Sequence, residues 1–429
     1  MTTLPKYERY KDSGVEWLGE VPEHWNVRRN LGVFDERKEC NQPEEELLSV
    51  TVSRGIIRQS EITAKKDSSN DDKSKYKVVR VGDLAYNKMR AWQGALGISA
   101  FNGIVSPAYV VLTPRNQKLS KYFHYLYRTP QFITEANRLS YGLCDDMNSL
   151  RYEHFKTSYT PLPPDDEIDR IVAFLDQKTA EIDALIAKKQ RQIELLDEQK
   201  AILINRAVTR GLNPNAKLKP SGIEWIGEIP EHWEVKNLKY VSTKIGTGRT
   251  PGTVAQAEDL PDGVHWYTPG DYRDSGFLDA SERRAKSTRL ETVETFPAGS
   301  LFYIGIGATL GRVNLSLHEA GCNQQINVIV INSSAHSAEY MLHLLNAGRE
   351  YIFSSSDFTT LPILNRSKTA TLSVVAPSKA EQEAIAAYCA DLVLKIQAVQ
   401  AKVAENIQSL QSLRSTLIAH AVTGRIKIN

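Results

Sequence analysis

Two segments of this chain carry apolar residues at a regular spacing of seven. In the first segment the series starts at Ile168 and ends at Leu203, with Lys189 filling one position. In the second segment the equivalent series runs from Cys389 to Leu417. A second apolar line accompanies each series, which is typical of a coiled-coil helix with two seams. The seam residues that we assign are Ile168, Ile171, Leu175, Ile182, Leu185, Leu196 and Leu203 in the first helix, and Ile385, Leu392, Ile396, Val399, Val403, Leu410 and Leu417 in the second.

The residues that flank the first segment indicate where its helix begins and ends. Pro161-Leu162-Pro163-Pro164 favours an extended approach, and the acidic residues at 165–167 suit a helix N-terminus. Gly211 and Pro214 mark the other end, so the helix should stop near Val208. A single amphipathic helix on a domain core is the alternative explanation of each pattern. Two helices of ~40 residues in matching register favour the coiled coil.

The chain also repeats its own plan. Residues 13–25 recur as residues 221–233 with only branched apolar residues exchanged, and residues 163–211 match residues 377–425 without a gap. Two such halves should be related by a pseudo-two-fold axis, which reverses one helix relative to the other. We therefore expect the two helices to pair antiparallel as a rigid spacer ~60 Å long.

The expected fold class is α+β, with two similar mixed α/β globular domains separated by a long antiparallel two-helix coiled coil and related by a pseudo-two-fold internal repeat. The predicted boundaries are residues 1–160 for the first globular domain, 161–214 for the central helical spacer, 215–375 for the second globular domain and 376–429 for the C-terminal helical spacer.

The globular domains should contain matching strands where the repeat is still recognisable. Residues 81–86 pair with residues 298–303 as strand candidates, and residues 109–112 pair with residues 326–331. Elsewhere the two domains diverge so strongly that residues 35–80 and 242–297 cannot be aligned. Two copies of one frame should therefore carry different surfaces.

Composition excludes several classes of protein. No apolar run reaches the ~18 residues of a membrane span, and the first residues lack a signal-peptide core, so we expect a cytoplasmic protein that contacts no membrane. The four cysteines lie far apart without a CxxC pair, which argues against a zinc module or a disulfide scaffold. Net charge is only +2, so a nucleic-acid binder of this composition needs local positive charge or a partner that supplies it.

The motifs do not indicate catalysis. The segment from Gly305 to Gly311 resembles a nucleotide loop only faintly, and a tight β-turn explains it better. Gly246 to Pro251 is not a Walker A loop, because no Gly-Lys-Ser/Thr follows. His24 and His232 are paired by the repeat and flanked by tryptophans, so we interpret them as structural. The histidines show no metal-ligand spacing, and we expect no metal site and no catalytic residue.

DNA contacts in proteins come mostly from Arg, Lys, Asn, Gln, Ser and Thr side chains. Clusters of these residues fall mainly in the divergent regions, although solvated surface charge is the alternative explanation for any single one. The DNA-binding candidates are Arg54, Arg58, Lys65, Lys66, Lys73, Lys75, Asn87, Lys88, Arg90 and Gln93 in the first domain, and Thr247, Arg249, Thr250, Arg283, Arg284, Lys286, Arg289, Arg312 and Gln324 in the second.

Together these features resemble the specificity subunit of a type I restriction–modification system. The resemblance rests on the twin Ser-Gly-x-Glu-Trp-x-Gly-Glu-x-Pro-Glu-His-Trp blocks, the Pro-Leu-Pro-Pro entry at 161–164, the helix ending in Ala-Val-Thr, and the duplication of the whole arrangement. The family usually has Glu-Gln at the helix entry. The second copy keeps it as Glu381-Gln382, whereas the first copy has Glu167-Ile168.

The resemblance implies a function in defence against phage. Two target recognition domains would each read one half of a bipartite, asymmetric double-stranded DNA sequence, and the helices would dock two adenine-N6 methyltransferase (modification) subunits. Restriction subunits would join through that complex. The chain would bind no cofactor and catalyse no reaction, because S-adenosylmethionine, ATP and Mg belong to the partner subunits. A coiled-coil scaffold without DNA, and a fused two-domain enzyme of unfamiliar type, are the alternatives.

Overall fold

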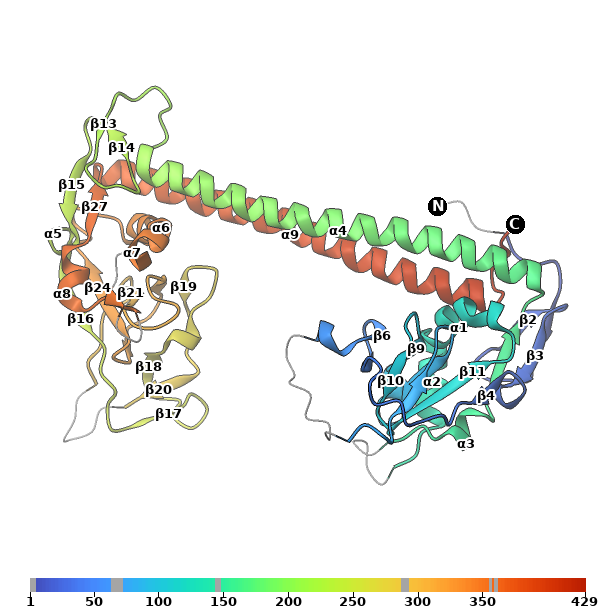
Figure 1. Cartoon of the computed structure of the whole chain (residues 1–429). Helices are drawn as coiled ribbons and strands as arrows, with labels where there is room; N and C mark the ends of the chain where they lie inside the picture. Colours follow the sequence, from blue (N-terminus) through green and yellow to red (C-terminus); the bar gives the residue numbers. More distant parts are fainter. Residues whose placement is uncertain (1–4, 63–71, 143–147, 287–292, 355–356, 359–361) are drawn as a thin grey trace. The chain divides into compact units, whose positions relative to one another are not determined.

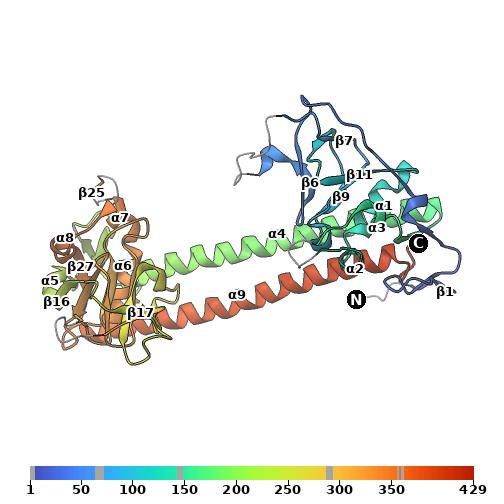
Figure 2. The same ribbon diagram turned by 90° about the horizontal axis from the view of Figure 1, so that it is seen from below.

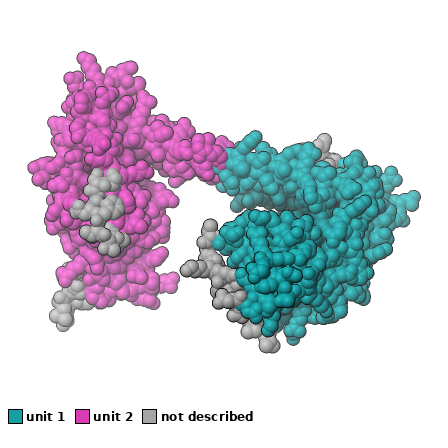
Figure 3. All heavy atoms as spheres, in the orientation of Figure 1, with its two compact units in different colours: residues 1–190, 404–429 teal, residues 191–403 magenta. Residues whose placement is uncertain are grey.

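The computed structural model describes residues 5–62, 72–142, 148–286, 293–354, 357–358 and 362–429. The chain folds into two compact units (Figure 3), of which unit 1 contains residues 1–190 and 404–429 and unit 2 contains residues 191–403. Short helices and mostly antiparallel strands make up the globular part of each unit (Figure 1), as the sequence predicts.

A four-stranded antiparallel sheet forms the centre of unit 1. The order of its strands is β4-β11-β8-β9, with β4 at Phe34–Glu36, β8 at Leu84–Asn87, β9 at Leu96–Ile98 and β11 at Tyr109–Pro114. Helix α1 (Ser120–Tyr127) packs on this sheet through aromatic side chains. The ring of Phe34 lies 4.8 Å from that of Phe123 and 5.7 Å from that of Tyr127, between ring centroids.

The other elements of unit 1 are short. Four strand pairs are β1 (Tyr10–Asp12) with β2 (Glu20–Pro22), β3 (Asn26–Arg29) with β12 (Tyr159–Leu162), β5 (Leu48–Thr51) with β6 (Gly55–Arg58), and β7 (Lys77–Val79) with β10 (Gly103–Val105). The remaining helices are η1 (Asn30–Gly32), η2 (Gln59–Glu61), η3 (Ala91–Gln93), η4 (Gln117–Leu119), α2 (Pro130–Arg138) and α3 (Tyr152–Phe155).

Unit 2 is built around a five-stranded sheet of order β16-β24-β21-β22-β19. Its strands are β16 (Ser242–Thr247), β19 (Phe277–Leu278), β21 (Leu301–Ile304), β22 (Val313–Ser316) and β24 (Ile326–Ile331). A second sheet has the order β17-β20-β18-β23, with β17 (Val254–Gln256), β18 (Val264–Tyr267), β20 (Arg283–Ala285) and β23 (Ala320–Cys322). Three pairs complete the strands, namely β13 (Leu218–Pro220) with β14 (Glu228–Pro230), β15 (Glu234–Asn237) with β27 (Ser373–Ala376), and β25 (Asp357–Phe358) with β26 (Pro362–Ile363). The short helices are α5 (Leu238–Val241), η6 (Pro269–Asp271), α6 (Ala338–Ala347), α7 (Arg349–Ser354) and α8 (Arg366–Thr371).

The same strand order recurs in the two units, because β4-β11-β8-β9 corresponds to β16-β24-β21-β22. The predicted strand pairs are confirmed as β8 with β21 and β11 with β24. Strands β8 and β21 begin later than predicted, because Gly82 and Gly299 adopt φ angles of +90° and +82° in a turn that precedes each strand. The segment from Gly305 to Gly311 is the predicted turn, closed by a hydrogen bond of 3.0 Å from the Leu310 amide to the Gly307 carbonyl.

Two long helices pass from one unit into the other. Helix α4 spans Asp165–Arg210, begins in unit 1 and ends in unit 2, whereas α9 spans Lys379–Val422 and runs from unit 2 into unit 1. In unit 1, Arg414 of α9 pairs with Asp183 of α4 at 2.9 Å. In unit 2, the Gln400 side-chain amide lies 3.4 Å from the Ile193 carbonyl. The two helices therefore lie side by side with opposite directions in each unit (Figure 2), which confirms the predicted antiparallel pairing.

One predicted seam of each helix is confirmed. Ile168, Leu175 and Ile182 are buried on α4, and Ile396 and Val403 are buried on α9. Further along, Leu196, Leu203, Leu410 and Leu417 are half-buried at the same heptad positions. Ile171 and Ile385, in the first turns, are also buried, because they pack into the cores of the globular domains.

The second predicted seam is wrong at Leu185 and Val399, whereas Leu392 in the same seam is half-buried. Leu185 is 47% exposed and Val399 is 43% exposed, whereas Ile186 and Gln400, one position further along, are half-buried. The line of buried residues along α4 shifts by one position after Leu175. The next buried residue is Thr179, which lies four positions after Leu175, whereas the predicted seam requires a spacing of three. The buried line along α9 shifts at the equivalent place in the repeat. Leu392, which is half-buried, lies next to this shift. A helix that leaves a domain core for a partner helix changes the face that it must bury.

Helix α9 also bears on the membrane prediction. Among the helices in the part of the chain that the structure describes, it alone has the length and composition of a membrane span, with a mean hydropathy of 1.3 over 18 residues. Ile385, Ile396 and Val403 on this helix are buried inside the protein. Of that 18-residue stretch 22% is buried, so packing inside the protein accounts for part of its apolar character.

The repeated blocks bind the first turns of the long helices. The Glu167 carboxylate on α4 accepts hydrogen bonds from Trp25 Nε1 and the Tyr7 hydroxyl at 2.9 Å each, and His24 Nε2 lies 2.5 Å away. Although burial opposes ionisation of Glu167, these hydrogen bonds lower its pKa. The histidines therefore have the structural place that the sequence suggests.

Unit 2 repeats this carboxylate arrangement with one difference beside it. Glu381 on α9 accepts from His232 Nε2 at 3.0 Å and from Trp233 Nε1 at 3.1 Å. The neighbouring Gln382 is buried and donates to the Pro377 carbonyl at 2.8 Å. In unit 1 the equivalent position is Ile168, which packs among apolar side chains. Each copy therefore satisfies the buried position in its own way, by hydrogen bonds or by apolar contact.

A buried tyrosine joins the end of one long helix to the strand before the other. The Tyr122 hydroxyl lies 2.8 Å from the Val422 carbonyl of α9 and 3.0 Å from the Pro161 carbonyl before α4. In unit 2 the Tyr340 hydroxyl lies 2.9 Å from the Val208 carbonyl and 3.2 Å from the Val375 carbonyl. Each unit therefore fixes the beginning of one long helix and the end of the other.

Candidate nucleic-acid interface

At one end of each central sheet, the turn that follows β8 or β21 lies beside the segment that leads into the longest strand, β11 or β24. We name it the turn end, formed by residues 87–94 and 106–108 in unit 1 and by residues 305–311 and 323–325 in unit 2. In unit 1 the Lys88 amide donates to the Ala108 carbonyl at 3.3 Å. In unit 2 the Gly305 amide donates to the Gln325 carbonyl at 2.8 Å. Backbone hydrogen bonds thus build the turn end in both units.

The turn end of unit 1 holds four of the predicted residues. The turn is closed by a hydrogen bond of 3.0 Å from the Arg90 amide to the Asn87 carbonyl. Arg90 and Gln93 are exposed, whereas Asn87 and Lys88 are half-buried. Burial lowers the pKa of the Lys77 ammonium, the Glu36 carboxylate opposes this shift, and the positive charge of Lys88 adds to it. The exposed cation at this turn end is Arg90.

The other cations predicted in unit 1 lie elsewhere. Arg58 pairs with Glu46 at 3.3 Å and lies 4.8 Å from the centroid of the Phe101 ring, and Arg54 pairs with Glu61. These arginines are therefore partly neutralised. Lys73 and Lys75 lie in the turn before β7, half-buried and exposed respectively. Lys65 and Lys66 lie outside the described residues.

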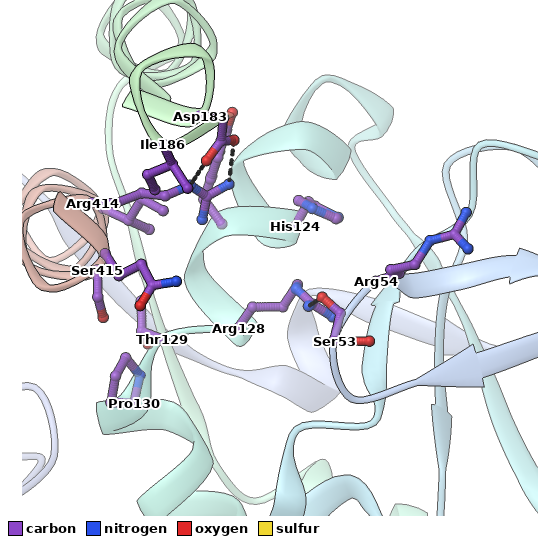
Figure 4. Close-up of a pocket in the computed structure, with 13 residues that line it drawn as sticks. Ser53, Arg54, His124, Arg128, Thr129, Pro130, Asp183, Ile186, Arg414 and Ser415 are labelled. Atoms are coloured by element: carbon purple, nitrogen blue, oxygen red, sulfur yellow. Dashed lines mark hydrogen bonds and ion pairs between the residues drawn. The ribbon is translucent and has the colours of Figure 1, made fainter. Parts of the chain in front are cut away.

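A groove of about 570 Å³ runs in unit 1 between the β5–β6 hairpin, α1 and the two long helices (Figure 4). Ser53, Arg54, His124, Arg128 and Arg414 are among its lining residues. The Arg128 guanidinium donates to the Leu96, Val52 and Ser53 carbonyls at 2.8, 3.0 and 2.9 Å. Burial lowers the pKa of His124 to about 4, so its ring is neutral at pH 7. His124 therefore adds no positive charge to the groove, and Arg128 holds the β5–β6 hairpin in place through the Val52 and Ser53 carbonyls.

In unit 2, several predicted residues are engaged with their own domain. The Arg284 guanidinium donates to the Gly263 carbonyl at 3.2 Å and also binds the Pro261 carbonyl. Arg312 pairs with Asp274 at 2.6 Å. These two arginines hold loops, a role that the sequence did not indicate. The hydroxyls of Thr247 and Thr250 donate to Asn327 at 2.8 Å and to Gln324 at 2.7 Å. Arg249 and Lys286 are exposed, and Arg289 lies outside the described residues.

A second groove, of about 420 Å³, lies at the turn end of unit 2. It is lined by Thr268, Pro269, Gly270, Glu282, Arg283, Ile306, Gly307, Ala308, Thr309, Asn323 and Gln325. Of the DNA-binding candidates predicted from the sequence, the groove contains Arg283 alone. Sequence reasoning missed Thr268 and Thr309, because neutral polar residues beside glycines look like ordinary turns. Among the residues that line this groove, Gln325 alone lies directly before a predicted strand, the one at residues 326–331.

The described residues include no group of three or more His, Cys, Asp or Glu side chains that could hold a metal ion. Burial raises the pKa of the Cys389 thiol to about 12 and raises that of Cys322 as well, so neither thiol is ionised at neutral pH.

The family model and the relatives that this chain matches are all described as type I restriction specificity proteins. Residues 230–407 match the type I restriction modification DNA specificity domain. A putative type I restriction enzyme specificity subunit, MjaX of Methanocaldococcus jannaschii, is 25% identical over 266 residues, which is 57% of this chain and 59% of that relative. The MjaVIII specificity subunit of the same organism is 29% identical over 154 residues, covering 35% of this chain and 34% of that relative.

Two solved structures share the fold over nearly the whole chain. A chain from a study of complex assembly and conformational transition of the type I R-M system has a TM-score of 0.69 at 15% identity, covering 94% of this chain and 98% of that one. The HsdS subunit of Thermoanaerobacter tengcongensis has a TM-score of 0.51 at 18% identity, covering 95% and 98% of the two chains. These likenesses establish the two-domain architecture with long helices.

Proposed function

We propose that this chain is a type I restriction–modification specificity subunit that recognises a bipartite, asymmetric double-stranded DNA sequence, because residues 230–407 match the DNA specificity domain of that family. Each globular domain reads one half of that sequence. The main observation behind this proposal is that the two units share one strand order but carry different residues at their turn ends. The two units share a strand order, while the turn end carries Lys88 and Arg90 in unit 1 and neutral polar residues in unit 2. Two different surfaces on equivalent frames suit two different half-sites.

We further propose that the long helices dock two adenine-N6 methyltransferase subunits, through which restriction subunits join. Large apolar side chains on the outer faces of the helices support this role. Leu195 and Ile202 on α4 are 48% and 67% exposed, and Leu394 on α9 is 66% exposed. Such residues on a helix surface are suited to contact with another protein. Leu185 and Val399, which the sequence assigned to the seam, belong to this outer set.

The chemistry is proposed to belong to the partners. The methyltransferase subunits would bind S-adenosylmethionine and extrude the target adenine from the duplex, and the restriction subunits would use ATP and Mg. This chain would bind none of these groups and act as the non-catalytic member of a cytoplasmic complex. Its net charge of +2 fits a complex in which partners supply part of the positive surface around DNA.

Methylation mapping tests the proposal. The full chain is co-expressed with its modification subunit in a host free of adenine methylation, and methyladenine is mapped across the genome by long-read sequencing. We expect one bipartite motif that disappears when this chain is omitted. Methylation without a motif would favour a scaffold, and methyl transfer by the chain alone would favour an enzyme.

A further inference from the structure

We propose that the groove at the turn end of unit 2 reads base edges in one half-site and that Gln325 is its specificity-determining side chain. This inference rests on the proposed function and assigns one half of the recognition to named atoms. The groove belongs to unit 2 alone, and the structure gives its lining residues directly.

The position of Gln325 is fixed from three sides. Its carbonyl accepts from the Gly305 amide at 2.8 Å, and its own amide donates to Asn323 Oδ1 at 3.2 Å. Its side-chain Oε1 accepts from Asn323 Nδ2 at 2.9 Å. The Gln325 Nε2 group, with two N–H donors, has no partner among the described residues. A side chain held in this way meets a ligand with little loss of conformational freedom.

The walls of the groove leave room for a flat, polar edge. Gly307 has a φ of +107°, and an added Cβ there would meet no atom within 4 Å. At Gly270 an added Cβ would meet only Thr268 Oγ1, at 3.7 Å. Two stretches of bare backbone therefore border the groove, and the exposed Thr309 adds a hydroxyl. Base edges in the major groove present donors and acceptors in one plane, which matches amide and hydroxyl groups at such walls.

The charge of the groove favours bases over phosphates. Arg283 and Glu282 are its two charged lining residues, and their charges are opposite. Phosphate binding is driven by net positive charge, which this groove lacks. A glutamate can instead accept from the cytosine amino group, and a glutamine can bind adenine bidentately. In unit 1 the equivalent turn carries Lys88 and Arg90, so the two domains offer different chemistry at the same place in the frame.

Substitutions of Gln325 in the full chain, expressed with the modification subunit, test the assignment. Methylation is measured on a library that contains every single-base change of the wild-type motif. Gln325→Ala should reduce discrimination at one position of one half-site by about 10-fold or more, the range for loss of a bidentate contact. The other half-site should be unchanged. Gln325→Glu, which keeps the shape and replaces the donors, should change the preferred base at the same position.

Asn215→Ala is the matched control. Asn215 is an exposed side-chain amide in the same unit, but it lies outside the groove and is not among the predicted DNA contacts. Its removal should leave the motif unchanged. Equal weakening on all sequences by Gln325→Ala, or an unchanged motif, would overturn the groove assignment alone. A wild-type chain that directs no bipartite methylation would overturn the proposed function as well.

Discussion

Lengthening both long helices by one heptad should widen the gap between the two half-sites. The insertions duplicate residues 183–189 in α4 and residues 397–403 in α9, which are equivalent places in the repeat. Seven residues lengthen a helix by ~10 Å, and they turn it only about 20° short of two full turns, so the seam is preserved. At ~3.4 Å per base pair the gap should grow by about three base pairs.

The same calculation predicts a cost in rate. Three base pairs rotate one half-site by roughly 105° about the DNA axis relative to the other. The lengthened protein should therefore methylate its new motif more slowly than the wild type methylates its own. Methylation mapping gives both the new gap and the methylated fraction of sites. The half-site sequences themselves should stay the same.

Insertion into α4 alone provides the control. It would place Ile186 and Ile193 out of step with their partners on α9, so the pair would lose its packing, and methylation of any bipartite motif should fall sharply. A doubly lengthened chain that keeps the wild-type gap would refute the idea that the helices set the spacing. A gap that changes after the single insertion would refute it equally.

Three further predictions concern stability and DNA contact. Glu381→Ala removes the acceptor of Trp233 Nε1 and should destabilise unit 2 by about 1–3 kcal/mol, with unit 1 unaffected, as hydrogen exchange of each unit would report. The folded-state pKa of His124, about 4, lies below its ordinary value of 6.5. The unfolded chain therefore binds the proton first, and unit 1 should lose up to about 3 kcal/mol between pH 6.5 and 4. Denaturation against pH would measure this loss, and His124→Phe should abolish it. Arg90→Ala should reduce the slope of log affinity against log salt concentration by about one, whereas Arg284→Ala should lower the stability of unit 2 instead, because its guanidinium holds a loop.

The sequence was sufficient to predict the two-domain architecture and the long helices, because these depend on residues that occur in both copies of the repeat. Trp25 and Trp233, with the glutamates they contact, hold the first turns of the long helices through side-chain hydrogen bonds. Such contacts require the same residue types in both copies, so the repeat identifies them. The pairing direction follows from the same duplication.

The second seam was mispredicted for a physical reason. Apolar spacing pointed to Leu185, but the helix face turns by one residue at Thr179, a polar residue that gives no hydrophobic signal. Thr179 can be buried because its hydroxyl donates to the Leu175 carbonyl at 2.7 Å. A local hydrogen bond of this kind is invisible in a hydrophobic pattern.

The candidate site was harder to predict from the sequence, because the sequence does not show whether a basic residue contacts DNA or a group of its own domain. Arg284 and Arg312 look like DNA contacts in the sequence, yet they bind carbonyl groups and Asp274 of their own domain. The sequence could not single out Gln325 from the polar residues beside it, because its position depends on a backbone hydrogen bond with Gly305 that only the fold creates.

The kind of contact that holds each region explains why the two copies share residues at the first turns of the long helices but differ at the turn ends. At the first turns of α4 and α9, side chains such as His24 and Glu167 make the contacts, so a substitution there costs stability. At the turn ends, the amides of Lys88 and Gly305 make backbone hydrogen bonds, so exposed side chains such as Arg90 and Thr309 are not needed to close these turns. Residues at a turn end can therefore differ between the two copies without loss of the frame. A surface whose shape is set by the backbone, and whose chemistry is set by free side chains, is suited to reading different DNA sequences on one scaffold.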